Sequence, residues 1–129
     1  MDRTVHLSSL IEKVADAPAP SRELFAEVWF ATTGKQQPDI KGRFAVLIDA
    51  KAWTEAALIT VACALPDWRV VTKARRGVGE ALMLPPNHLG IVPERSGDTV
   101  RHAGGTALAI LQAMLVTMVE CQWSHNVKL

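Results

Sequence analysis

The sequence has few cysteines and no excess of either charge, and these two shortages exclude several classes of protein. Its two cysteines, Cys63 and Cys121, sit in apolar stretches without a CxxC spacing, which excludes a disulfide scaffold and favours a reducing cytoplasm. Lysine and arginine number 14 against 13 aspartates and glutamates. Because a net charge of +1 offers nucleic acid no electrostatic footprint, we expect no nucleic-acid partner.

Targeting and membrane signals are also missing. Residues 1–17 lack the basic start, the apolar core and the cleavage site of a signal peptide. The uncharged run 103–119 contains Gly104, Gly105 and Gln112, and it falls short of the roughly 20 apolar residues of a membrane span. The length of 129 residues and the hydrophobic fraction of 49% therefore predict one globular domain over 1–129, located in the cytoplasm.

Periodicity and capping residues predict four helices. Residues 5–16 have an amphipathic pattern, and Ser21 is a good N-cap for a helix that ends near Ala31, which together predict a helical pair over 1–32. Further helices are predicted over 54–65 and 106–121. The last helix is apolar around nearly its whole circumference, so either a sheet between two helical layers or another subunit must cover it.

The remaining chain predicts a small antiparallel sheet. A hairpin is predicted from two strand-like segments, 68–75 and 80–84, that flank the turn RGVG. Gly77 or Gly79 would supply the positive φ of the turn. Alternation along the first strand makes one of its faces basic. Residues 89–92 are a possible third strand, and 44–48 predict a short strand with a helix start as the alternative. Residues 33–43 and 93–105 are predicted loops, and 122–129 a tail. The predicted fold is a three-layer α+β sandwich, in which an antiparallel sheet of three to four strands has helices packed on both faces.

The segment before the last predicted helix offers the most suggestive chemistry. A glycine-rich turn that opens a helix leaves backbone N–H groups at the positive end of the helix dipole, where they bind phosphate or carboxylate. Ordinary loop and capping roles explain the same residues without a ligand. The candidate anion site consists of Arg75, Arg76, Arg101, His102, Gly104, Gly105 and Thr106.

Recognisable catalytic, cofactor and metal motifs are absent from the sequence. The pair Gly77 and Gly79 is an incomplete GxGxxG, and no Walker lysine, GxSxG or HExxH occurs. The four histidines have no ligand spacing, so we expect neither a cofactor nor a metal. Acid/base catalysis would have to use Glu80, Glu94, Asp98 or His102, and nothing in the pattern pairs or desolvates them. We therefore expect a protein that is not an enzyme, with a small enzyme as the alternative.

Trp123 stands apart from the other tryptophans because it follows the last predicted helix among polar residues. An exposed tryptophan is a typical anchor for a partner or a second copy of the chain. Folding back over the helix is an equal alternative. Together with the apolar last helix, this residue leads us to expect a homo-oligomer.

Three strings resemble the phage ABA sandwich domain family. They are PSREL at 20–24, WTEAALITVACALPDW at 53–68 and GGTALAILQAML at 104–115, and each is a packing or capping pattern. The resemblance implies a layered fold, a phage or prophage origin and an accessory protein in the bacterial cytoplasm. It implies no catalytic residues.

The function expected on these grounds is a phage-encoded, non-enzymatic binding module. Its target would be a small anionic or nucleotide ligand, or a host protein, as in a counter-measure against host defence. The alternatives are a small enzyme acting on a phosphorylated substrate and a phage structural or assembly protein.

Overall fold

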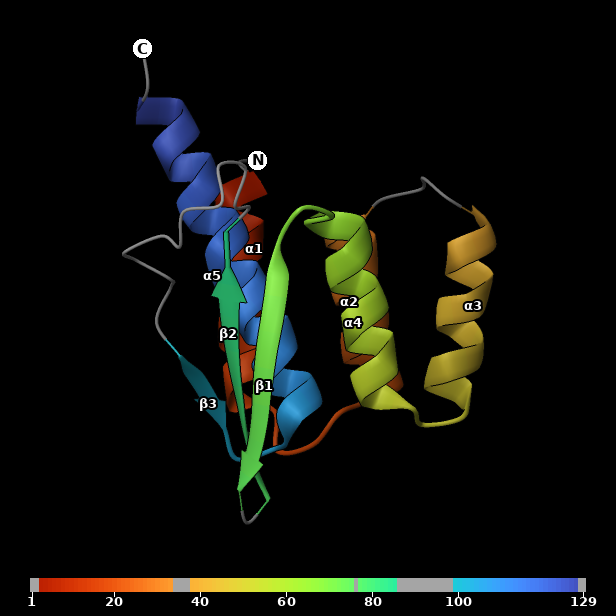
Figure 1. The fold of residues 1–129 in the computed structure, drawn as a ribbon. Coiled ribbons are helices and arrows are strands. Elements are labelled where there is room, and N and C mark those ends of the chain that lie inside the picture. Colours follow the sequence, from red (N-terminus) through yellow and green to blue (C-terminus); the bar gives the residue numbers. More distant parts are fainter. Residues whose placement is uncertain (1–2, 34–37, 76, 86–98, 128–129) are drawn as a thin grey trace.

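The structure is a computed structural model that describes residues 3–33, 38–75, 77–85 and 99–127. These residues form five helices and one three-stranded antiparallel sheet (Figure 1), which confirms the α+β class. In chain order the elements are α1 (Arg3–Asp16), α2 (Arg22–Thr32), α3 (Pro38–Asp49), α4 (Trp53–Ala64), β1 (Arg69–Arg75), β2 (Val78–Leu84), β3 (Val100–His102) and α5 (Thr106–Val127).

Helix α5 is the centre of the fold. It contacts the sheet, α1 and α4 (Figure 1), and its residues Leu108, Ile110, Leu111, Met114 and Leu115 are all buried. The chain's own elements thus bury most of the apolar side chains of this helix between Thr106 and Val119.

The predicted hairpin is confirmed. Strands β1 and β2 pair antiparallel from Arg69↔Leu84 to Arg75↔Val78, and Gly77 takes the positive φ of 83° that the turn requires. Every second residue of β2 is buried, namely Gly79, Ala81 and Met83, and α5 packs against this face. A layer of helices on the opposite face, as in the predicted sandwich, is not shown by the part of the chain that the structure describes.

Helices α2, α3 and α4 extend to one side of the sheet and α5 (Figure 1). The Ser21 hydroxyl accepts a hydrogen bond from the Leu24 amide, which confirms the predicted N-cap of α2. Aromatic contacts join these helices: Phe25 packs on Trp53 with 5.0 Å between ring centroids, and Trp29 stacks on Phe44 at 4.4 Å.

Three sequence predictions are wrong. Residues 38–48 form most of α3 rather than a loop and a strand. Phe44 and Ile48 are buried, whereas Val46 between them is 66% exposed. Burial of residues i and i+4 is the pattern of a helix face. Residues 100–102, predicted as loop, form β3. Residues 122–127, predicted as tail, continue α5. The possible strand at 89–92 lies outside the described residues.

Candidate functional site

His102 is held on both ring nitrogens by the protein itself. The side chain is 6% exposed, and its Nδ1 accepts a hydrogen bond from the Gly104 amide at 2.8 Å. The proton of the neutral ring therefore lies on Nε2, which donates to the carbonyl oxygen of Val14 at 2.6 Å. This imidazole joins the turn before α5 to the end of α1 and has no nitrogen left for a ligand.

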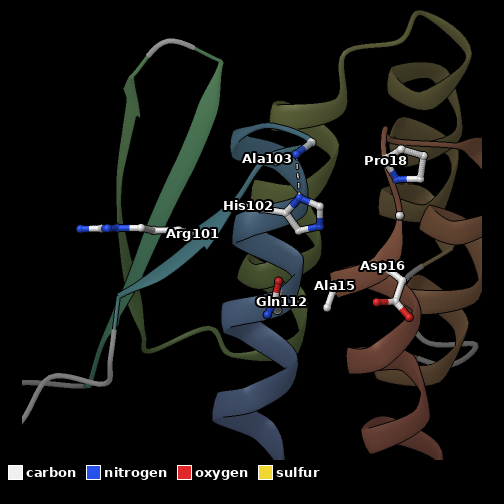
Figure 2. A pocket seen from close by; sticks show the side chains of 9 residues that line it. Ala15, Asp16, Pro18, Arg101, His102, Ala103 and Gln112 are labelled. Atoms are coloured by element: carbon white, nitrogen blue, oxygen red, sulfur yellow. Dashed lines mark hydrogen bonds between the residues drawn. The ribbon is translucent and has the colours of Figure 1, made fainter.

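Arg101 points away from His102, since neighbouring residues of a strand face opposite sides of a sheet (Figure 2). Its Nε donates to Glu80 Oε1 at 3.2 Å, on the sheet face that α5 does not cover. The guanidinium end is largely exposed, with 76% of the side chain accessible. The side chains of these two members of the predicted anion site therefore point to opposite faces of the sheet, although both residues line the pocket described below.

The first turn of α5 is closed by the sheet. Gly79 of β2 approaches it so closely that an added Cβ would collide with the backbone of Thr106 and Gly105. Gly79 itself is buried. Gly105 has a φ of 118° and donates its amide to the carbonyl of His102. Of the backbone groups that the sequence offered to an anion, the amides of Gly104 and Gly105 thus bond to His102, and that of Thr106 lies against β2.

The other predicted site residues are placed only in part. Arg75 ends β1, but its side chain lies outside the described part of the structure, and so does the whole of Arg76. Trp123 belongs to α5 rather than to a tail, and its side chain is also outside the described part. The side chains of these three residues are therefore not part of the site geometry described above.

A pocket of about 400 Å³ lies between the end of α1 and the turn before α5 (Figure 2). Asp16 and Gln112 bring side-chain polar groups to it. The half-buried amide of Gln112 makes no hydrogen bond with any residue that the structure describes. The lining residues are Ala15, Asp16, Ala17, Pro18, Arg101, His102, Ala103, Gly104 and Gln112.

A second surface, which we call the outer sheet face, is the side of the sheet that faces away from α5. The strand register places Val71 opposite Leu82, and it places Glu80 between Lys73 and Arg101. Val71 is 45% exposed. Three cations and one carboxylate leave this face with two surplus positive charges among the described side chains, although the whole chain is nearly neutral. Its residues are Arg69, Val71, Lys73, Glu80, Leu82, Leu84 and Arg101.

Strand β1 forms one edge of the sheet. It pairs only with β2 among the described strands, and Thr72, Lys73 and Ala74 are all exposed. An edge strand presents a row of unpaired backbone N–H and C=O groups. The sequence signalled this surface through the alternating cations of the first strand, but the position of the strand within the sheet was not predictable from that pattern.

Metal and thiol chemistry find little support in the described residues. No three histidine, cysteine, aspartate or glutamate residues within those ranges are grouped as metal ligands would be. Cys63 is half-buried on α4 and not in a disulfide, and burial raises the pKa of its thiol. A raised pKa disfavours the reactive thiolate. Within the same ranges, no helix combines the length and apolarity needed to cross a membrane.

Comparison of the chain with protein-family models, curated proteins and solved structures gave no match. The resemblance to the phage ABA sandwich domain family therefore stays a prediction.

Proposed function

We propose that the protein is a non-enzymatic interaction module that binds an acidic protein partner through the outer sheet face. The observation that carries this proposal is the combination of exposed Val71 with the positive charges of Arg69, Lys73 and Arg101, of which Glu80 offsets one. An apolar centre with charged surroundings is typical of protein contact surfaces. The charges would orient an acidic partner and exclude a basic one.

The engagement of the candidate acid–base groups with other residues of the chain supports a binding role over a catalytic one. A general base needs a nitrogen or oxygen free to take a proton from substrate, whereas both nitrogens of His102 are engaged with Val14 and Gly104. Glu80 is engaged with Arg101. Both side chains are thus occupied by other residues of the chain.

The family resemblance supplies the biological setting of the proposal. A phage-encoded accessory protein acting in the bacterial cytoplasm would meet host proteins, and an acidic host protein fits the outer sheet face. Self-association remains a competing use of the same surface. The cations of two copies would meet there, however, and like charges at close range oppose such a dimer.

Selection from a displayed library of random peptides tests the proposal. We expect the selected peptides to be enriched in aspartate and glutamate, and we expect Lys73→Glu to lose them. The matched control is Arg43→Glu, because Arg43 is equally charged and exposed but lies on α3. Peptides without acidic enrichment, or equal losses in the two variants, would contradict the proposal.

A second candidate function is capture of a small polar molecule in the pocket beside His102. It is favoured by the unpaired, half-buried Gln112 amide, which lies at the pocket (Figure 2). A thermal-shift screen with nucleotides, phosphate and small amines tests it, since a ligand raises the melting temperature through mass action. A shift that Gln112→Leu abolishes would support this candidate, and no shift would remove it.

A further inference from the structure

We infer that the partner docks by adding an extended strand to the free edge of β1, and that it carries the pattern acidic, any, apolar, any, acidic. This inference rests on the proposed function, because it specifies how the outer sheet face is used. The juxtaposition that carries it is the edge of β1 that no described strand pairs with, together with the alternation of Arg69, Val71 and Lys73 along that edge.

Among the described residues, none pairs with the outer edge of β1. Strand β1 has seven residues, and the described part of the chain pairs it on one side only, with β2. Residues Val71 to Ala74 are exposed on both faces of the sheet. An added strand would satisfy the backbone groups of β1 and cover these side chains, which is the established mode of strand addition to a sheet edge.

The side chains determine which strand fits. Residues directly opposite each other on paired strands have Cβ atoms about 5 Å apart, and opposite charges or apolar pairs at this distance are favourable. The added strand would therefore place an acidic residue beside Arg69, an apolar residue beside Val71 and an acidic residue beside Lys73. Because this pattern reads the same in both directions, it suits a parallel as well as an antiparallel strand.

The same argument disfavours a second copy of β1 as the occupant. If two copies of β1 paired edge to edge, Arg69 and Lys73 of one chain would lie beside the same residues of the other. Like charges on opposed residues are destabilising. Neither Arg69 nor Lys73 has an acidic partner within hydrogen-bond distance in the described structure. Arg69, which lies opposite Leu84, and Lys73, which lies opposite Glu80 without bonding to it, therefore point to an acidic strand from a different protein.

The test uses a capped peptide with Glu-Thr-Val-Thr-Glu at its centre and isothermal titration of the full chain. We expect saturable binding that weakens about tenfold, or 1.4 kcal/mol, in Lys73→Glu and is unchanged in Arg43→Glu. A peptide with the same residues in the order Glu-Glu-Val-Thr-Thr should bind more weakly. Equal binding of the two peptides would overturn the inferred pattern.

Backbone methylation separates strand addition from simple charge attraction. Two further peptides carry N-methyl groups on alternate residues, in the two possible phases. Only one phase removes the N–H groups that face β1, so one peptide should lose binding and the other should keep it. Equal binding of both would overturn the inference while leaving the proposed function standing, provided that Lys73→Glu still loses the selected acidic peptides. A free chain that is already a dimer protected from hydrogen exchange along β1 would also overturn it.

Discussion

The imidazole of His102 is bonded to the main chain of Val14, 88 positions earlier in the sequence, with 2.6 Å between Nε2 and the carbonyl oxygen. The bond ties β3 and the turn before α5 to the end of α1. It explains why a histidine beside a glycine-rich turn, which suggests an anion site in the sequence, acts as a structural connector in the fold.

Replacing this histidine should destabilise the fold. In His102→Ala the Gly104 amide loses its acceptor and a buried ring is removed, so we expect the free energy of unfolding to fall by about 3 kcal/mol. Urea denaturation measures the change. The control is His6→Ala, because His6 is exposed on α1 and should change stability by less than about 0.5 kcal/mol. Equal effects in the two variants would contradict the structural role.

The same substitution should have opposite effects at two glycines. Gly79→Ala forces a Cβ into the backbone of Thr106 and should cost about 3 kcal/mol, the upper end of ordinary overpacking. Gly42→Ala lies in α3 with nothing within 4 Å of the added Cβ, and it should stabilise by about 0.5–1 kcal/mol because alanine favours helix. Thermal melts measure both changes, and a tolerated Gly79→Ala would show that β2 and α5 do not meet as described.

Cys63 should give the stability a dependence on alkaline pH. Its pKa is raised from the ordinary value of 9.0 by burial, so as pH rises above 9 the unfolded chain loses this proton before the folded chain does. The contribution to stability is therefore constant below pH 9 and falls above it. Cys63→Ala should lose less stability than the wild-type chain between pH 8 and pH 10 in urea melts. Parallel curves would show that the thiol does not titrate differently in the folded state.

Much of the fold was predictable because its signals are local. Ser21 before an apolar period, and the RGVG turn between two alternating segments, each specify an element within a few residues. Helix α3 was missed because Pro38 and Gly42 suggest a loop. Proline is in fact favoured in the first turn of a helix, and Gly42 occupies an exposed position where it is tolerated.

The rest depends on contacts that sequence patterns do not carry. Strand β3 has three residues, too few to show a period, and only its pairing with β2 defines it. The site prediction grouped Arg101 with His102 because they are neighbours in the chain, but a strand separates neighbours onto opposite faces. Glu80 and Arg101 meet only through the register of β2 with β3.

Chemical-shift mapping by NMR, with the Glu-Thr-Val-Thr-Glu peptide added to the full chain, tests the proposed interaction surface most directly. The predicted result is a set of amide shifts along Arg69 to Lys73 of β1. At the same peptide concentration these shifts should be smaller in Lys73→Glu, and they should shrink as salt rises, because exposed charges are screened. Shifts confined to the pocket at His102 and Gln112, or no shifts at all, would contradict the assignment of the outer sheet face as the binding surface.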